Sequence, residues 1–252
     1  MNFLNKTVLI TGGSRGIGRA TAQAFAERGA KVAINFRSDS QAAKDTINSL
    51  PGEGHFAAKA DISNPSSVEK LVDAVTNEFG SLDIVINNAG VYIAHPIDNT
   101  DFKNWGKAWH DTLSVNLTGA ANVCYCAAQQ MMKQGSGRIV NISSRGAFRG
   151  EPDHPAYGAS KAGLNAMSQS LAKKLAPYNI YVTTVAPGFV ETDMAREFLD
   201  GPEGEAIKIQ SPLNRAATPE EIAKAILWMS SEGCEYVTGA ILDVNGASYL
   251  RS

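Results

Sequence analysis

Short apolar runs alternate along the chain with longer stretches in which apolar residues recur at helical spacing. The runs are about five or six residues long, typical of strands buried on both faces, and the stretches between them span roughly a dozen residues or more. This alternation predicts βαβ units, and therefore an α/β fold with a doubly wound (Rossmann-type) parallel sheet and helices on both faces. The seven expected strands are residues 7–10, 31–36, 55–60, 83–86, 138–142, 180–185 and 240–244.

Helix-boundary signals recur between these strands. Asn64 precedes Pro65, and residues 218–221 read Thr-Pro-Glu-Glu, which combines an N-cap, a first-turn proline and a capping-box glutamate. Gly29 follows the first helical stretch and is expected to end it. No repeat, low-complexity tract or linker divides residues 1–252, so we predict a single domain.

Residues 188–217 form the one long irregular stretch, with three glycines and two prolines around a weakly helical segment. A connection of this length in a compact domain usually has a function. We therefore expect a lid that moves over a site, with a tolerated surface insertion as the alternative.

The composition excludes several classes of function. The chain has 23 Lys and Arg residues against 25 Asp and Glu, a formal net charge of -2, so no overall field favours nucleic acid or an anionic membrane. Small molecules are the expected partners. The three cysteines form no Cys-x-x-Cys pair and the histidines no ligand pattern, so we expect neither disulfides nor a metal site. With no export signal and no apolar run of membrane length, the sequence predicts a cytoplasmic protein.

A glycine-rich turn follows the first predicted strand. Gly12, Gly16 and Gly18 stand in the segment Thr-Gly-Gly-Ser-Arg-Gly-Ile-Gly, between a strand and a helix. Glycines there let the backbone approach a pyrophosphate and aim helix N-terminal amides at it, which predicts a dinucleotide site. The spacing is G-x-x-x-G-x-G, and the alternative is a tight strand-to-helix turn without a ligand. The turn residues expected at the cofactor are Gly12, Ser14, Arg15, Gly16, Ile17 and Gly18.

The end of the second strand indicates which dinucleotide is bound. An enzyme that prefers NAD places an acid here for the ribose 2′-hydroxyl, but Phe36 is followed by Arg37 and Ser38. Together with Arg15, these side chains suit a 2′-phosphate, so we favour NADP(H) over NAD(H). Single arginines at strand ends are more often solvated surface charges, and the prediction depends on the pairing across two turns.

A tyrosine and a lysine one helical turn apart are the candidate proton-transfer pair. Tyr157 and Lys161 share one helix face, and an ammonium close to the phenol is expected to lower the pKa of that phenol. Ser144 follows an apolar strand and would stand at the carboxyl edge of the sheet, where a hydroxyl can bind a substrate oxygen. The alternative for Ser144 is a hydroxyl that only stabilises a turn.

Taken together, these residues resemble the single-domain branch of the short-chain dehydrogenases/reductases, and within it the members similar to 3-oxoacyl-acyl-carrier-protein reductases. The similarity extends over essentially the whole chain. The matching motifs, in order, are Thr11-Gly12-x-x-x-Gly16-Ile17-Gly18, Asp61-Ile62, Asn87-Asn88-Ala89-Gly90, Val115-Asn116-Leu117, Ser144, Tyr157-x-x-x-Lys161 and Pro187-Gly188-Phe189-Val190-Glu191-Thr192.

The resemblance implies a role for each matched residue. Ser144 positions the carbonyl, Tyr157 is the acid in reduction and the base in oxidation, and Lys161 binds the nicotinamide ribose. Asn116 holds a water that connects Lys161 to solvent. Asp61 is implied at the adenine edge. The remaining implied cofactor contacts are Ile62, Asn88, Ala89, Gly90, Tyr157, Pro187, Gly188, Val190 and Thr192, the last at the carboxamide.

Three of these residues have simpler interpretations. Asp61 can act as an acid at a helix start, Asn116 as a polar residue inside a helix, and Thr192 as an N-cap. The resemblance also implies a homotetramer and an acyl-carrier-protein-bound substrate, a 3-oxoacyl thioester. A basic patch beside the entrance would suit such a carrier, and the thin candidate is Lys133, Arg138, Lys173 and Lys174.

The sequence therefore predicts an NADP(H)-dependent oxidoreductase that transfers a hydride between nicotinamide and a carbonyl or secondary alcohol. Oxidation of an alcohol, sugar or steroid hydroxyl is one alternative, because the same residues serve both directions. A dinucleotide sensor without catalysis is another, since a fold does not define a function. The predicted substrate pocket is mixed, lined by Tyr92, Ile93, His95, Arg145, Phe148, Arg149, Glu151 and His154, whose two arginines would attract an anion.

Overall fold

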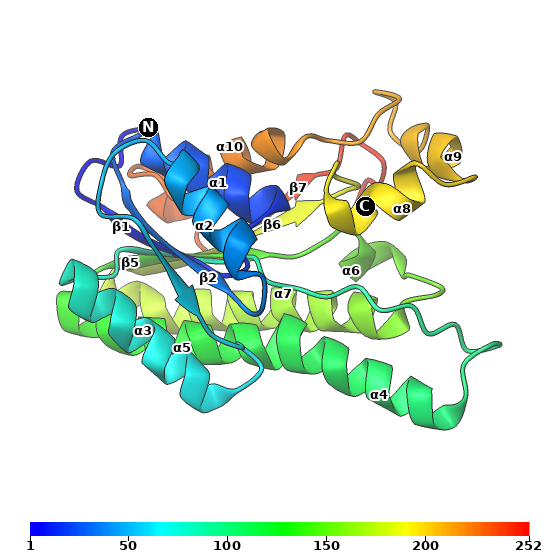
Figure 1. The fold of residues 1–252 in the computed structure, drawn as a ribbon, viewed down its shortest axis with the longest axis horizontal. Coiled ribbons are helices and arrows are strands. Elements are labelled where there is room, and N and C mark those ends of the chain that lie inside the picture. The colour runs from blue at the N-terminus through cyan, green and yellow to red at the C-terminus, as the bar shows by residue number, and fades with distance from the viewer. Residues whose placement is uncertain (252) are drawn as a thin grey trace.

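The computed structural model describes residues 1–251 and contains one seven-stranded sheet (Figure 1). Its strands are β1 (Thr7–Ile10), β2 (Lys31–Phe36), β3 (Phe56–Lys59), β4 (Ile84–Asn87), β5 (Gly137–Ile142), β6 (Ile180–Pro187) and β7 (Ile241–Val244). The strand order is β3-β2-β1-β4-β5-β6-β7, and all neighbouring pairs are parallel. The predicted fold class is confirmed, with all seven expected strands present.

Five of the seven strands (β3, β4, β5, β6 and β7) differ from the sequence prediction by one or two residues at an end, and two of these differences have a local reason. β6 continues to Pro187 because Ala186 and Pro187 still pair with the end of β7. β3 begins after His55, whose ring Nδ1 accepts a hydrogen bond from the backbone N–H of Val32. The imidazole thus takes the place of a ladder bond at the start of that strand.

Helices cover both faces of the sheet (Figure 1). α1 (Gly16–Ala26), α2 (Ser40–Ser49) and α10 (Pro219–Met229) lie on one face, and α3 (Pro65–Phe79), α4 (Phe102–Leu113), α5 (Ala120–Gln134) and α7 (Pro155–Leu175) lie on the other. Short helices α6 (Gly146–Arg149), α8 (Asp193–Leu199) and α9 (Gly204–Lys208) lie beyond the carboxyl ends of β5 and β6. None of the helices in residues 1–251 has the length and apolar character needed to cross a bilayer.

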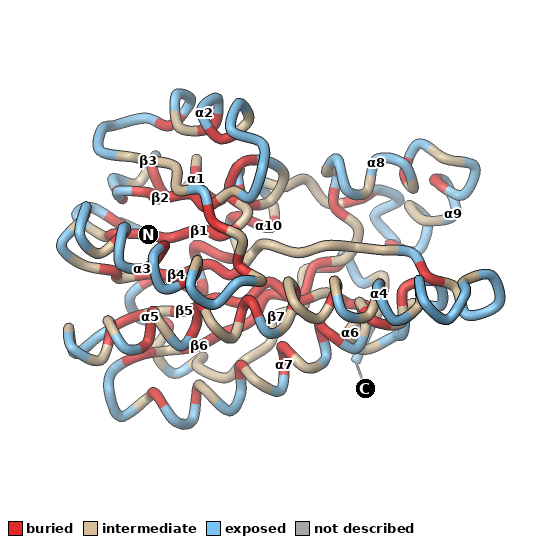
Figure 2. Tube along the Cα trace, turned by 60° about the horizontal axis from the view of Figure 1, so that its bottom comes forward, coloured by how far each residue is buried: buried red, intermediate tan, exposed pale blue. Residues whose placement is uncertain are grey.

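The alternation of side chains along each strand builds two hydrophobic cores. On β1, Val8 and Ile10 pack in the core that includes Phe25 of α1 and Ile226 of α10. Leu9 points to the opposite face and packs in the core formed with α3, α5 and α7. The strands are accordingly buried throughout the centre, while the outer faces of the helices are exposed (Figure 2).

The predicted helix boundaries are confirmed where side-chain caps were expected. Asn64 accepts from the N–H of Ser67 at the start of α3, and Thr218 forms a complete capping box with Glu221 at the start of α10. α1 differs, because its N-cap residue Arg15 makes no side-chain cap bond and its first turn contains no acid. The amide groups at this helix end are therefore left for another acceptor.

The order of the strands in the sheet reverses between β1 and β4, which lie side by side although β2 and β3 come between them in the chain. A crevice outside the carboxyl ends of the strands is expected at such a reversal. The segments that follow β1, β4, β5 and β6 all reach this edge, and the candidate site is built from them.

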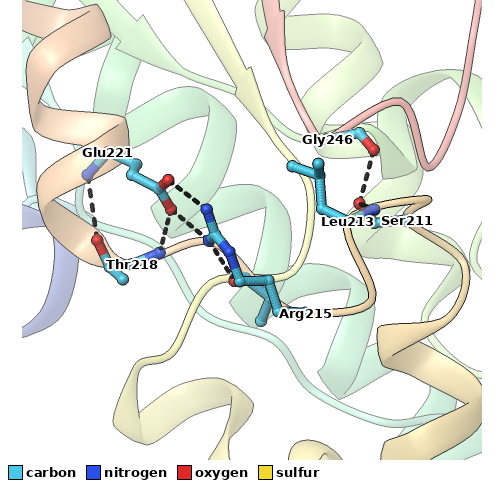
Figure 3. A network of polar contacts seen from close by, with 7 residues as sticks. Ser211, Leu213, Arg215, Thr218, Glu221 and Gly246 are labelled. Carbon is cyan, nitrogen blue, oxygen red and sulfur yellow. Dashed lines mark hydrogen bonds and ion pairs between the residues drawn. The ribbon is translucent and has the colours of Figure 1, made fainter.

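Residues 188–217 leave this edge and return to it. The segment folds into α8 and α9, and a parallel bridge between Val190 and Ala217 joins its two ends. Ser211 donates to the carbonyl of Gly246, and Arg215 pairs with Glu221, so the returning end is held at two places (Figure 3). The segment thus contains two short helices, α8 and α9, joined by irregular chain. Its action as a mobile lid stays a prediction, as does the single-domain description.

Candidate functional site

The glycine turn after β1 is joined to the turn after β4 by one hydroxyl and one amide. Thr11 Oγ1 accepts from the backbone N–H groups of Asn88 and Ala89 at 3.0 and 3.1 Å. Asn88 Nδ2 donates back to the carbonyls of Thr11 and Gly12, both at 3.0 Å. Gly12 has φ +62°, and a Cβ there would lie 2.9 Å from Ala89 Cα, so only glycine permits this approach.

The same turn contacts the start of the helical segment 188–217. Gly16 has φ +52°, and a Cβ on it would lie 3.1 Å from Thr192 Cγ2. The Thr192 hydroxyl donates to the backbone carbonyl of Val190 at 3.4 Å. It makes no cap bond to α8, although Thr192 occupies the N-cap position. The segment after β6 therefore lies beside the N-terminus of α1, where the resemblance placed Thr192 against the cofactor.

Each of the two neighbouring turns, after β1 and after β2, carries an exposed arginine. The backbone N–H of Gly13 donates to the carbonyl of Asn35, and this bond joins the two turns. Ser14 is buried, and its carbonyl accepts from the Thr46 hydroxyl of α2. Arg15 and Arg37 are exposed, and neither forms an ion pair within residues 1–251. Ser38 is exposed after Arg37.

Asp61 and Ile62 follow β3 at the outer end of this arrangement. Ser63 donates its hydroxyl and its backbone N–H to Asp61 Oδ1, at 2.7 and 2.9 Å. Hydrogen bonding by Ser63, with a smaller contribution from the Arg37 charge, keeps the pKa of Asp61 below its usual value despite partial burial. Ile62 is buried in the core on the α3 and α5 side. The carboxylate thus remains ionised while it stabilises the turn before α3.

The predicted catalytic side chains come together at the carboxyl edge of β5. Ser144 follows β5, and its Oγ accepts from the N–H of Gly146 at 3.0 Å. Tyr157 and Lys161 lie on α7, and Lys161 Nζ donates to the carbonyl of Ile142 at 2.7 Å. The ammonium stands 5.6 Å from the centre of the Tyr157 ring. Phenol, hydroxyl and ammonium thus share one site.

Burial dominates the acidity of the tyrosine and the lysine. It raises the pKa of Tyr157 to about 12, and hydrogen bonding by Ser144 offsets only part of this rise. Burial also lowers the pKa of Lys161 to about 8. The direction is opposite to the lowered tyrosine pKa expected from the sequence, because burial disfavours the phenolate. The Tyr157 phenol is therefore protonated at neutral pH.

Asn116 stands in a π-helical turn, η1 (Ser114–Gly119), between α4 and α5. Its Oδ1 accepts from the N–H of Val91 at 2.8 Å, and its Nδ2 donates to the carbonyl of Val91 and to Ser160 Oγ. The side chain therefore ties the segment after β4 to α7. A π-turn frees backbone groups at a functional site, and the water-holding role of Asn116 stays a prediction.

Gly90 leaves room between Asn116 and Lys161. A Cβ on Gly90 would lie 3.3 Å from Asn116 Oδ1 and 3.6 Å from Lys161 Nζ. On the opposite side, the carbonyl of Pro187 accepts from the N–H of Arg145, and Gly188 N–H donates to Val244. The loops after β4, β5 and β6 therefore meet around the proton-transfer pair, as the motif order predicted.

The residues expected at a dinucleotide fit that group. The uncapped start of α1, whose first turn has no acid, suits a pyrophosphate, and the cations after β1 and β2 suit the adenosine end. Lys161, with Gly90 opposite, lies where the nicotinamide end would be. In residues 1–251 no three His, Cys, Asp or Glu side chains gather as metal ligands.

An aromatic cluster lies beside Tyr157, and it includes residues that the sequence predicted at the substrate pocket. Tyr92 stacks on His154 with ring centres 3.6 Å apart, and meets Tyr157 edge-on at 4.7 Å. Burial lowers the pKa of His154 to about 4, so this ring is neutral. Phe198 of α8 contacts both Tyr92 and His154. The sequence indicated Tyr92 and His154 but missed Phe198, since nothing in an irregular segment shows which side chain faces the site.

His95 positions the catalytic helix and does not face the reaction. Its Nδ1 bonds the carbonyl of Ile93 at 2.8 Å, and its Nε2 accepts from the N–H of Ala156 at 3.2 Å. The ring is 1% exposed. It therefore fastens the segment after β4 to the first turn of α7, one residue before Tyr157. The sequence predicted that His95 lines the substrate pocket, and this prediction is wrong.

The basic patch expected to receive an acyl carrier is wrong in its location. Arg138 lies at the start of β5, where it pairs with Glu235 and stacks on Tyr181, whereas Ser144 follows the other end of that strand. Lys173 and Lys174 end α7, which begins beside Tyr157. The start of β5 and the end of α7 lie at the opposite edge of the sheet from Ser144 and Tyr157. The patch therefore lies on the edge opposite to the site.

Comparison with known proteins places this geometry in a family. A family model described as enoyl-(acyl carrier protein) reductase matches residues 12–247. The 3-oxoacyl-[acyl-carrier-protein] reductases FabG of Vibrio cholerae and Escherichia coli K12 are 38% and 37% identical over 250 residues, 99% of this chain and 100% of each relative.

A solved structure agrees. A short-chain dehydrogenase from Burkholderia cenocepacia J2315 in complex with NADP is 31% identical with a TM-score of 0.89, covering 98% of this chain and 99% of that one. The chain therefore belongs to the short-chain dehydrogenase/reductase family and is an oxidoreductase that interconverts C–OH and C=O groups with a nicotinamide dinucleotide. Within that family, relatives similar to it over nearly their full length include 3-oxoacyl-[acyl-carrier-protein] reductases.

Proposed function

We propose that the protein is an NADPH-dependent reductase of carbonyl compounds, with 3-oxoacyl thioesters among its candidate substrates. The observation that supports this proposal is geometric: the Tyr157 phenol, the Ser144 hydroxyl and the Lys161 ammonium gather at the carboxyl edge of β5. Reduction of a carbonyl needs a proton donor at the oxygen, which the Tyr157 hydroxyl can supply, and the full-length relatives compared above are named as reductases.

The chain's own residues then divide the reaction between them. Ser144 and Tyr157 hold the substrate oxygen from two sides, and Tyr157 delivers its hydroxyl proton to that oxygen. Bound NADPH supplies the hydride. Lys161 keeps a positive charge beside Tyr157, and Asn116 keeps the segment after β4 in place against α7. Tyr92 and Phe198 exclude water from the substrate face.

The preference for NADPH is supported by the two cations after β1 and β2. Arg37→Ala should raise KM for NADPH by about ten- to a hundredfold, because a charge-assisted hydrogen bond contributes roughly 1.5–3 kcal/mol. KM for NADH should change by less than about threefold, since its adenosine ribose carries no phosphate at that position. Steady-state kinetics with both cofactors measures the split.

Lys44→Ala is the matched control, because it removes an exposed cation from α2 without touching either turn. An equal rise in KM for NADH and NADPH in the Arg37 variant would remove Arg37 from 2′-phosphate recognition. The preference for NADPH would then need another explanation.

The substrate class is tested by NADPH oxidation with 3-oxoacyl thioesters, simple ketones, quinones and ketosugars, with NADH in parallel. We expect reduction of at least one carbonyl class and slower reverse reaction with the matching alcohol at neutral pH. Faster oxidation of an alcohol than reduction of any carbonyl, under the same conditions, would overturn the reductive assignment.

The proposal includes the surroundings in which the enzyme works. Its relatives are named for substrates carried by an acyl carrier protein, and we propose such a carrier as a partner. We further propose a cytoplasmic homotetramer, and the 188–217 segment as its substrate lid. Light scattering of the purified enzyme tests the homotetramer. Kinetics that compare a carrier-bound 3-oxoacyl group with its free thioester test the carrier as a partner.

A further inference from the structure

Arg145, the residue after Ser144, is a buried cation that the mechanism above does not use. Its side chain is 3% exposed, and its backbone N–H is bonded to Pro187, which fixes it between the ends of β5 and β6. It forms no ion pair with any carboxylate of residues 1–251. A guanidinium buried to this extent normally has an anionic partner.

The groups that contact Arg145 are neutral or carry the same charge. Its Nη2 donates to Gln210 Oε1 at 2.7 Å, and its guanidinium lies 4.9 Å from the centre of the Phe189 ring. Arg149 Nη1 donates to the same Gln210 oxygen at 3.0 Å. Two guanidinium groups thus converge on one neutral amide oxygen.

This convergence is unfavourable unless a negative charge lies at the meeting point. Burial, and to a smaller extent the Arg149 charge, lower the pKa of Arg145, and Glu151, which raises it, accepts from Tyr92 and forms no ion pair with Arg145. An amide oxygen carries only a partial charge, whereas a carboxylate oxygen at the position of Gln210 Oε1 would form charge-assisted bonds with both arginines.

We propose that Arg145 and Arg149 form a subsite for a carboxylate of the substrate, and that this carboxylate takes the place of the Gln210 side chain. The inference rests on the proposed function and specifies its substrate class: a ketone that carries a carboxylate a few bonds from the reacting carbonyl. Arg145 directly follows Ser144 in the chain, and the proposal places the carboxylate subsite next to the carbonyl site on that ground. Gln210 belongs to the 188–217 segment, so binding of the anion also releases one of its contacts.

The test compares pairs of substrates that differ only in charge: acetoacetate against methyl acetoacetate, and 4-oxopentanoate against its methyl ester. The wild-type enzyme should favour the acid of at least one pair. Arg145→Met should lower kcat/KM for that acid by about ten- to a hundredfold and leave the ester within about threefold, because a hydrogen bond to a charged group is lost only for the acid. Arg145→Lys should restore part of the loss.

Gln210→Glu supplies an internal competitor of nearly the same shape. Its carboxylate should fill the subsite, raise Tm, and raise KM for the acid by about tenfold with little change for the ester. Gln210→Ala should instead lower KM for the acid. Arg196→Ala is the control, since it removes an exposed cation of α8 that pairs only with Asp193.

Two results overturn the subsite. One is a wild-type preference for both esters, and the other is an equal loss on acid and ester in Arg145→Met, which would make Arg145 a contact for the lid alone. If neither acid nor ester oxidises NADPH, the proposed function fails, and binding decides the subsite. Saturating 4-oxopentanoate should then raise the Tm of wild type with NADPH and leave that of Arg145→Met unchanged. The absence of a rise in wild type would refute the subsite.

Discussion

Replacement of Tyr157 by Phe should leave NADPH binding unchanged within about threefold and reduce carbonyl turnover by about a thousandfold, within the range that positioned acid catalysis supplies. The substitution removes only the hydroxyl group, whose proton is the one expected to reach the substrate oxygen. The ring stays in place, so its edge-on contact with Tyr92 is kept. Cofactor binding by NADPH fluorescence and turnover by absorbance separate the two effects.

Tyr125→Phe provides the matched control, because that tyrosine lies exposed on α5 and is 67% accessible. It should retain full activity. If Tyr157→Phe keeps turnover while Tyr125→Phe behaves as expected, proton donation by Tyr157 is refuted. Loss of NADPH binding together with turnover would mean that the hydroxyl serves cofactor binding.

Lys161→Met should produce an enzyme that is inactive yet more stable below about pH 8. Burial lowers the pKa of Lys161 to about 8 in the folded protein, whereas an unfolded lysine has a pKa near 10.4. In the window between these values the unfolded chain binds more protons, so the free energy of unfolding of wild type rises with pH. The burial of the charged form costs roughly 3 kcal/mol, which the variant avoids at pH 7.

The measurement is the difference in free energy of unfolding, by urea, between wild type and Lys161→Met from pH 7 to pH 10. We expect the difference to favour the variant at pH 7 and to shrink by about 3 kcal/mol towards pH 10. Lys173→Met, an exposed site on the same helix, should show no such trend. A difference that does not vary with pH would show that Lys161 is not held at a lowered pKa.

The elements of the fold could be predicted because their signals are local. The burial of β1 on both faces goes with the apolar residues Val8, Leu9 and Ile10, and the capping box at Thr218 needs only residues three apart in the chain. The motif residues of the site were also predictable, since the carboxyl ends of parallel strands must share one edge. Ser144, Tyr157 and Lys161 are placed together for that reason.

The direction in which the Tyr157 pKa shifts could not be predicted in this way. A lysine one turn away is visible in the sequence and lowers a phenol pKa, but the burial that raises it to about 12 comes from the chain packed around α7. The same holds for His95, whose ring fastens Ala156 across a sequence gap of 61 residues. Solvent exclusion depends on all neighbours at once, and spacing along one segment contains none of that information.

By itself, then, the sequence determined the sheet, the glycine turn and the placement of Tyr157 and Lys161 one helical turn apart, because strand periodicity and helix spacing are short-range properties. The tertiary structure alone decided that Phe198 faces Tyr92, that two arginines meet at Gln210, and that the basic patch of Arg138 occupies the wrong edge. Those outcomes depend on where separate segments come to rest, and that is settled by packing over the whole domain.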